Sequence, residues 1–249
     1  MTEKRPLVAV LTGAGISTDS GIPDYRGPQG LWQRDPSAQE LVTIGPYLES
    51  TEVRRRSWLL RRDAGAGSAE PNPGHLALVE LERSGVPMRV LTQNVDGLHQ
   101  KAGLPARKVI ELHGTAAEVQ CVGCAAVTTM AAALERVAAG EDDPGCAQCG
   151  EVLRPRTVMF GEPLDDRVVE QAATVASACQ LFIAVGTSLQ VTPAALLPAE
   201  ALENGAKLII VNGEPTHYDG DAAEVIREPI SEALPKLVRR IVDGDLSRG

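Results

Sequence analysis

The sequence predicts an α/β fold in which a doubly wound parallel sheet carries a second, smaller domain formed by two insertions. Short apolar runs alternate with helical patterns along most of the chain, which is typical of an open sheet with helices on both faces. A glycine-rich turn at Gly13 and Gly15 follows the first apolar run. Residues 36–74 and 116–152 interrupt the alternation, so we assign them to the smaller domain.

Individual elements follow from the apolar pattern. We expect strands at Leu7–Leu11, Met88–Leu91, Val109–Leu112, Leu181–Val185 and Leu208–Val211. Amphipathic spacing predicts helices at His75–Ser84, Leu164–Ala178, Pro193–Glu203 and Ile230–Val242. The main domain then comprises residues 1–35, 75–115 and 153–249. In the smaller domain we expect helices within residues 36–74 and at Thr128–Ala139.

Composition narrows the class of protein. Of 249 residues, 43% are hydrophobic and only 3% aromatic, so the core must consist of Ala, Val, Leu and Ile, as suits a buried parallel sheet. The net charge of −9 offers no electrostatic basis for binding nucleic acid. The charged N-terminus lacks a signal-peptide pattern, and no apolar run is long enough for a membrane span. We therefore expect a soluble, cytoplasmic protein.

Small or hydrogen-bonding residues follow every predicted strand. They form the runs Thr12–Gly15, Thr92–Asp96, His113–Gly114, Gly186–Ser188 and Asn212–Glu214. Turn formation alone accounts for such residues at one or two strand ends. Because ligands of open α/β sheets bind outside the carboxyl ends of the strands, five such ends predict one composite site.

The turn after the first strand fits a dinucleotide but departs from the dehydrogenase pattern. Gly13 and Gly15 permit close backbone approach, and the amides that follow suit a pyrophosphate. A dehydrogenase fingerprint has a third glycine where this chain has Thr18. The next loop carries an acid, an aromatic ring and a guanidinium group: Asp24, Tyr25 and Arg26. These groups indicate chemistry at the ribose of the dinucleotide rather than hydride transfer.

Two cysteine pairs predict a structural zinc site. Cys121-x-x-Cys124 and Cys146-x-x-Cys149 can each chelate one side of a tetrahedral ion, and four thiolates leave no open coordination position. A redox Cys-x-x-Cys and an iron–sulfur cluster are the alternatives, and two matched pairs in one insertion favour zinc over both. Cys179 stands alone and is expected to be a buried apolar residue.

His113 is the candidate base, because it directly follows a predicted strand. A histidine in such a place can also be a purely structural hydrogen-bonding group, but the nearby Gln93-Asn94-Val95-Asp96 run favours a catalytic role. The remaining histidines, His75, His99 and His217, are expected to be positional or structural.

Taken together, these motifs resemble those of the sirtuins, the NAD-dependent protein deacylases. The resemblance includes Gly13–Gly27, with Tyr25 where the family usually has Phe, then Thr92–His99, His113–Gly114, the cysteine pairs, Leu153–Pro155, Phe160–Glu162, Gly186–Leu189 and Val211–Asn212. It covers nearly the whole chain in the family's order. It implies NAD as co-substrate, one structural Zn²⁺ ion and acylated-lysine proteins as substrates, as in bacterial members.

The resemblance also implies a reaction that gives free lysine, nicotinamide and O-acyl-ADP-ribose. The acyl oxygen attacks C1′ of the nicotinamide ribose as nicotinamide leaves, and His113 removes a ribose hydroxyl proton so that the 2′-oxygen attacks the imidate carbon. Asn94 and Asp96 would orient the ribose and the carboxamide. Further NAD contacts are implied at Gly13, Ala14, Gly15, Asp24, Tyr25, Arg26, Trp32, Gln93, Gly186, Thr187, Ser188, Asn212, Glu214 and Ile230.

Substrate contacts are implied at two places. An added substrate strand, with a plain linker as the alternative, is implied along Val158, Phe160, Gly161 and Glu162. Sirtuins that prefer succinyl or malonyl lysine carry Tyr-x-x-Arg on an earlier helix, and the nearest match here is Trp58-Leu-Leu-Arg61. Arg61 is therefore a candidate for an acyl carboxylate, with Trp58 beside it. Because the indole offers only an N–H donor and Arg61 also fits a solvated helix face, deacetylation is the expected activity.

Three other functions fit parts of the sequence. An NAD-dependent ADP-ribosyltransferase or glycohydrolase shares the C1′ chemistry, although Asn94, Asp96 and His113 together favour deacylation. A Rossmann oxidoreductase is disfavoured by Thr18. A zinc-ribbon binding module with an inactive nucleotide fold is disfavoured by the intact catalytic-type residues. The oligomeric state is left open, with a monomer as one alternative.

Overall fold

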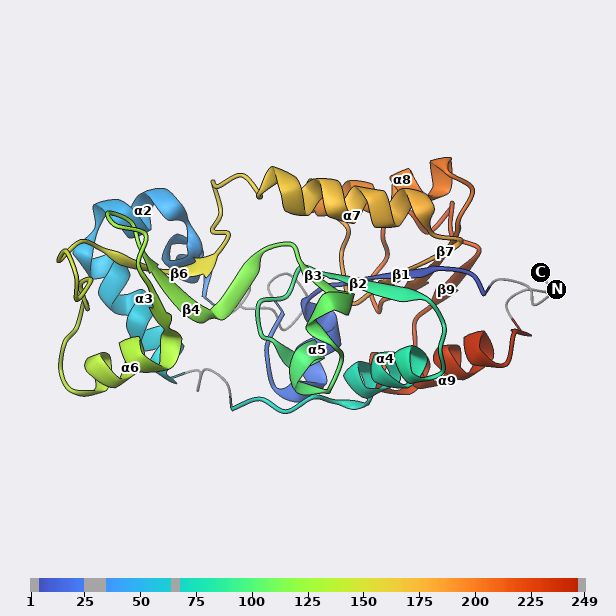
Figure 1. The fold of residues 1–249 in the computed structure, drawn as a ribbon, viewed down its shortest axis with the longest axis horizontal. Helices are drawn as coiled ribbons and strands as arrows, with labels where there is room; N and C mark the ends of the chain where they lie inside the picture. Colours follow the sequence, from blue (N-terminus) through green and yellow to red (C-terminus); the bar gives the residue numbers. More distant parts are fainter. Residues whose placement is uncertain (1–4, 25–34, 64–67, 246–249) are drawn as a thin grey trace.

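Two sheets organise the computed structural model, which describes residues 5–24, 35–63 and 68–245 (Figure 1). The larger sheet has six parallel strands in the order β3-β2-β1-β7-β8-β9. Their bounds are β1 Val8–Thr12, β2 Met88–Thr92, β3 Val109–Glu111, β7 Leu181–Val185, β8 Lys207–Val211 and β9 Glu224–Ile226. The first five agree with the predicted strands to within one residue at each end. The sequence pattern missed β9, a three-residue edge strand that is only partly buried.

Helices cover both faces of the larger sheet, so the doubly wound fold is confirmed (Figure 1). One face carries α4 (Pro73–Arg83) and α9 (Ile230–Val242), and the other carries α7 (Asp166–Ala178) and α8 (Leu197–Glu203). Shorter helical segments are η1 Ala14–Ser20, α5 Leu98–Lys101, η3 Ala106–Lys108 and η4 Ala194–Leu196. The helix predicted at Pro193–Glu203 is therefore divided into a 3₁₀ turn and α8.

Strand β1 shows why the core has two halves. Successive side chains of a strand point to opposite faces, so Val8 and Val10 enter the core beneath α4 and α9, whereas Ala9 and Leu11 enter the core beneath α7 and α8. All five residues of β1 are buried. A strand buried on both faces reads as a continuous apolar run, which is why it was predictable from the sequence.

The smaller sheet is antiparallel, in the order β5-β4-β6, and lies at the other end of the molecule (Figure 1). Its strands are β4 Gly114–Cys121, β5 Val127–Thr129 and β6 Leu153–Thr157, with α6 (Met130–Ala138) beside them. The first insertion contributes η2 (Pro36–Val42), α2 (Ile44–Glu49) and α3 (Thr51–Asp63), and α3 packs against α6. The predicted helix at Thr128–Ala139 corresponds to α6.

Strand β6 begins at a predicted domain boundary. The sequence pattern placed residue 153 at the return to the main domain, yet β6 pairs with β4 through Cys121 and Leu153. Residues 153–157 therefore belong to the smaller sheet, because the sheet to which a strand belongs is set by its hydrogen bonds to neighbouring strands and not by local composition. No helix within the described residues is long and apolar enough to cross a membrane.

Candidate active site and metal centre

The turn after β1 packs directly against the loop after β7. A Cβ atom at Gly13 would lie 2.6 Å from the carbonyl oxygen of Gly186, and a Cβ atom at Gly186 would lie 2.4 Å from the backbone nitrogen of Ile16. The amide of Gly15 donates to the Gly186 carbonyl at 2.9 Å. Glycine is required here because backbone meets backbone. Two strand ends that are distant in sequence are thus held together as one cradle, in which Ala14 is the first residue of η1.

Asn94 and Asp96 join that cradle through Ser17. The Asn94 side-chain amide donates to the Gly13 carbonyl at 3.0 Å and to the Ser17 hydroxyl at 3.3 Å. Ser17 in turn donates to an Asp96 carboxylate oxygen at 2.7 Å, and the other Asp96 oxygen accepts from the Leu98 amide at 2.9 Å. Ser17 has no exposed surface. Sequence analysis did not single it out, although it lies within the glycine motif.

His113 lies where the chain passes from the larger sheet into β4. Its Nδ1 atom lies 2.8 Å from the Gln93 carbonyl oxygen. A carbonyl can only accept a hydrogen bond, so Nδ1 carries the proton and Nε2 keeps its lone pair. Burial lowers the pKa of His113 below the ordinary 6.5, while the bond to Gln93 acts in the opposite direction. The neutral ring is therefore arranged as a proton acceptor at Nε2.

Two further histidines are buried beneath the Asn94–Asp96 turn. His99 Nε2 lies 2.9 Å from the Thr12 hydroxyl, which donates to the Thr92 hydroxyl at 2.8 Å. Burial lowers the pKa of His99 to about 3, and the neighbouring His75 adds to this effect. The two rings lie 5.1 Å apart between centroids. Both are neutral at physiological pH. His99 is linked through Thr12 and Thr92 to the Asn94 amide, which donates to the Thr92 hydroxyl at 3.1 Å, whereas His75 accepts from the Asn72 amide at 3.4 Å.

Polar groups at the remaining strand ends lie on either side of the cradle. Gln93 donates from its side chain to the Thr187 hydroxyl at 2.8 Å. After β8, the Arg227 guanidinium donates to the carbonyls of Asn212 at 2.6 Å and Glu214 at 2.8 Å, and fixes that loop. Arg227 was not predicted, because only the folded chain brings it there. Two predicted contact residues, Ser188 and Ile230, are half-buried at the loop after β7 and the start of α9.

The predicted substrate segment, Val158–Glu162, is hydrogen-bonded to two other parts of the chain and ends in a turn. The Val158 amide donates to the His113 carbonyl at 2.8 Å, and the Phe160 amide donates to the Val42 carbonyl at 2.9 Å. Glu162 turns back, accepting from the Met159 amide at 2.9 Å and from Arg154 at 2.6 Å. Glu162 is thus engaged within the chain and shapes the segment, with Gly161 at a positive φ of 92°.

Trp58, the predicted neighbour of Arg61 at the acyl group, lies in the interior of the smaller unit. It is fully buried in the core of the smaller unit together with Val119 and Met130. Its side chain has no exposed surface in this structure. Arg61, one turn later on α3, donates to the Ser57 carbonyl at 2.9 Å and contacts the Ser57 hydroxyl. Tyr25, Arg26 and Trp32 lie outside the described residues, and Asp24 is the half-buried residue before them.

The four paired cysteines converge on one point. The Sγ atoms of Cys121, Cys124, Cys146 and Cys149 all lie within 4.8 Å of one another. The closest pairs are 3.4 Å and 3.6 Å apart, and Zn–S bonds of about 2.3 Å in a tetrahedron put sulfur atoms about 3.8 Å apart. The Gln148 amide donates to Cys146 at 3.4 Å, and such backbone donors lower the pKa of this thiol to about 6. This donor set fits one structural Zn²⁺ ion, whereas Cys179 is buried elsewhere.

The fold and the strand-end site together define the class of protein. Residues 13–193 match the model of the Sir2 family. The chain therefore belongs to the Sir2 family, the sirtuins.

Individual relatives agree over nearly the full length. The chain is 63% identical over 235 residues to NAD-dependent protein deacetylase 2 of Streptomyces coelicolor, covering 94% of this chain and 98% of the relative. A structure described as the basis for the mechanism and regulation of Sir2 enzymes superposes with a TM-score of 0.85 at 41% identity, covering 95% and 93% of the two chains. A complex of Sir2 with a p53 peptide and NAD+ superposes with a TM-score of 0.79 at 34% identity, covering 98% and 95%.

Proposed function

We propose that this chain is an NAD-dependent protein-lysine deacetylase that produces free lysine, nicotinamide and O-acyl-ADP-ribose. Membership of the Sir2 family and 63% identity to a bacterial NAD-dependent protein deacetylase support the activity. The single observation that carries the mechanism is the hydrogen bond from His113 Nδ1 to the Gln93 carbonyl, at 2.8 Å. It leaves Nε2 free of its proton, as a general base requires.

The strand-end cradle supports dinucleotide binding. Gly13, Gly15 and Gly186 hold two loops at backbone contact, and the lack of side chains at these positions lets a dinucleotide approach the backbone closely. Bound NAD supplies an electrophilic C1′, whose bond to nicotinamide is broken. Asn94 and Asp96, fixed through Ser17, would orient the ribose and the carboxamide. Asn212 and Glu214, held by Arg227, would contact the adenosine end.

His113 would take a proton from the ribose hydroxyls of the substrate complex. Burial lowers its pKa below the ordinary 6.5, which keeps the base neutral at the pH of the cell. Proton removal would let the 2′-oxygen attack the acyl carbon; the lysine amine would then leave with a proton, and water would add to the acyl carbon so that O-acyl-ADP-ribose is released. Because the four cysteines saturate a zinc ion, they would stabilise the smaller sheet and take no part in this proton transfer.

The segment Val158–Glu162 would pair with the backbone of an acylated-lysine peptide. Within residues 5–24, 35–63 and 68–245, no donor reaches the Val158 carbonyl, so it remains an acceptor for a strand added from solution. Backbone pairing suits substrates that differ in sequence. The Ser57 contacts of Arg61 and the burial of Trp58 support acetyl rather than acidic acyl groups as the main substrate.

Mass spectrometry of the products tests this function. The purified protein is incubated with NAD and matched acetyl- and succinyl-lysine peptides, with His113→Ala as control. We expect free lysine peptide and O-acetyl-ADP-ribose, faster turnover of the acetyl peptide, and no deacylation by His113→Ala despite retained NAD binding. Nicotinamide release without deacylation would move the assignment to ADP-ribosyl transfer or NAD hydrolysis. We also propose a cytoplasmic location, which cell fractionation tests.

A further inference from the structure

Helix α2 begins at the proposed peptide-binding segment. Ile44 is the first residue of α2, and its amide donates to the Phe160 carbonyl at 3.0 Å. The Phe160 amide in turn donates to the Val42 carbonyl at 2.9 Å. Thr43 and Phe160 also form an isolated parallel bridge. Any displacement of α2 would therefore move Phe160, because both of its backbone polar groups are bonded to the residues that lead into this helix.

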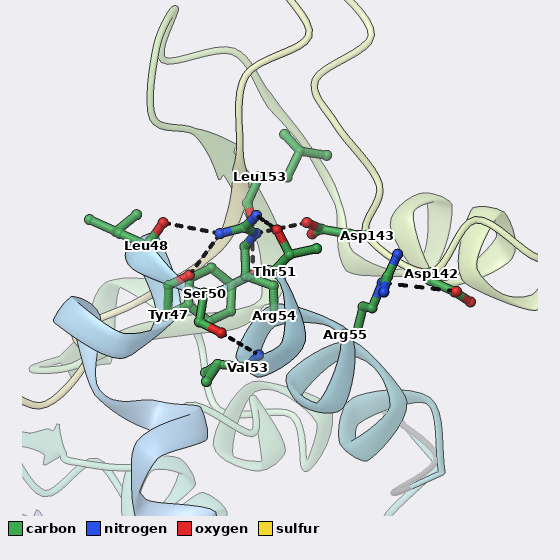
Figure 2. A network of polar contacts seen from close by, with 10 residues as sticks. All are labelled: Tyr47, Leu48, Ser50, Thr51, Val53, Arg54, Arg55, Asp142, Asp143 and Leu153. Carbon is green, nitrogen blue, oxygen red and sulfur yellow. Dashed lines mark hydrogen bonds and ion pairs between the residues drawn. The ribbon is translucent and has the colours of Figure 1, made fainter.

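The other end of α2 is held by Arg54 (Figure 2). Its Nη1 atom donates to the carbonyls of Tyr47 at 3.2 Å and Leu48 at 3.0 Å, which lie in the last turn of α2. Its Nη2 atom donates to Thr51 at 2.9 Å, and its Nε atom donates to Asp143 at 2.8 Å. Only 8% of Arg54 is exposed. The guanidinium thus satisfies carbonyls that a helix end leaves without partners.

Both attachments of α2 at this end lead to the cysteine site. Asp143 lies in the loop that precedes Cys146. The Tyr47 hydroxyl donates to the Leu153 carbonyl at 2.9 Å, and Leu153 is the β-sheet partner of Cys121. One short helix therefore connects the cysteine cluster to the segment proposed to bind the substrate.

A neighbouring ion pair provides an internal comparison. Arg55 lies 3.9 Å from Asp142, and their side chains are 48% and 69% exposed. The Arg54–Asp143 side chains are only 10% and 20% exposed. Exposed pairs contribute little because water and salt screen them, whereas a buried guanidinium with several hydrogen bonds fixes the groups around it. Figure 2 shows both pairs joining α3 to the same loop.

We propose that Arg54 is a positioning residue for acyl-peptide binding, and that through it peptide affinity depends on the metal at the cysteine site. Without the guanidinium, or without an ordered loop at Asp143, the last turn of α2 keeps only the Tyr47–Leu153 hydrogen bond, and the alignment of Val158–Glu162 is weakened. The inference rests on the proposed function of that segment. The hydrogen bonds that Arg54 donates to Tyr47, Leu48, Thr51 and Asp143 all lie within the smaller unit, so NAD binding at the larger sheet should be unaffected.

Calorimetry with the zinc-loaded protein tests the inference. The Kd values of an acetyl-lysine peptide and of NAD are measured for the wild type, Arg54→Met, Arg54→Lys, Asp143→Asn and the control Arg55→Met. We expect Arg54→Met to weaken peptide binding by about fivefold or more, a typical coupling between sites. Arg54→Lys should lose less peptide affinity than Arg54→Met, because lysine retains the positive charge although it lacks the planar guanidinium with its several donors. NAD affinity should hold in all variants, and Arg55→Met should match the wild type.

Kinetics and hydrogen exchange distinguish positioning from general stability. Arg54 variants should show a raised KM for peptide with kcat retained at saturation, and faster amide exchange at Ile44 and Phe160 but not in β1. Chelation of zinc from the wild type should reproduce the peptide loss and the local exchange while NAD still binds.

The outcomes separate the two proposals. A wild type that binds no acetyl peptide defeats the proposed function itself. A functional wild type whose Arg54 and Asp143 variants bind peptide normally overturns the inference. Parallel loss of peptide and NAD binding also overturns it, because Arg54 would then act on the fold as a whole. If Arg54→Met fails to fold, Arg54→Lys and Asp143→Asn decide.

Discussion

Replacement of Gly186 by alanine tests whether the close approach of two strand-end loops is needed for dinucleotide binding. The new Cβ atom would lie 2.4 Å from the Ile16 nitrogen and 2.7 Å from the Gly15 carbonyl carbon. Favourable contacts between such atoms begin near about 3.5 Å, so the loops must separate by about 1 Å. That separation would strain the 2.9 Å hydrogen bond from the Gly15 amide to the Gly186 carbonyl.

Two costs contribute to the expected loss of stability. Gly186 has a φ of +60°, and a residue with a Cβ atom pays roughly 1–2 kcal/mol in this left-handed conformation. Overpacking adds about 1–3 kcal/mol. The free energy of unfolding should therefore fall by roughly 2–5 kcal/mol. Gly205 is the matched control, because its φ is +84° and no atom lies within 4 Å of the equivalent Cβ.

Urea denaturation measures the free energy of unfolding, and calorimetry measures the Kd for NAD. Gly186→Ala should lose about 1–3 kcal/mol more than Gly205→Ala, and only Gly186→Ala should weaken NAD binding, by about tenfold or more. Equal losses of stability in the two variants, with unchanged NAD affinity, would refute the argument that the cradle depends on backbone contact.

Three other predictions concern titration and the substrate segment. Because burial lowers the pKa of His113 below 6.5 and the base acts when neutral, the acid limb of kcat/KM should have its midpoint below pH 6.5, and a higher midpoint in rate profiles would contradict this role. Glu162→Gln removes the negative charge and replaces one of the two carboxylate oxygens that accept from Arg154, so initial-rate kinetics should show a peptide KM raised roughly tenfold with an unchanged KM for NAD; a normal peptide KM would argue against a role of the Arg154–Glu162 pair in shaping this segment. The pKa of His99 is about 3 in the folded protein and 6.5 ordinarily, so between these values the unfolded chain binds more protons than the folded protein. The free energy of unfolding should therefore decrease as the pH is lowered below 6.5, by up to about 1.4 kcal/mol per pH unit. Urea titrations at several pH values should show a smaller slope for His99→Gln, and an identical slope would exclude this contribution.

Local patterns explain how much of the fold was predictable. Strands such as β1 are buried on both faces, so their apolar runs are continuous and bounded by glycine or polar residues. Edge strand β9 has three half-buried residues and no such contrast. The cysteine pairs were predictable because short chelating turns need only local spacing, and the four sulfurs do converge.

Some site residues could not be assigned from local pattern. Trp58 stands in a helical spacing that fits either a substrate surface or a core, and only the packing of α3 against α6 decides for the core. The sequence does not reveal that the Glu162 carboxylate accepts hydrogen bonds from Arg154, which the folded structure shows. Ser17 lies in a recognisable motif, but its contact with Asp96 joins residues 79 positions apart.

The sequence by itself determined the doubly wound sheet, the glycine turn, the cysteine site and the position of the candidate base, because each depends on the periodicity or spacing of neighbouring residues. The tertiary structure alone decided the tautomer of His113, the burial of Trp58 and the contacts of Arg54. These depend on which distant segments meet: Arg54 and Asp143 are 89 positions apart, and no local pattern records that a guanidinium will meet its carboxylate only after two insertions have packed together.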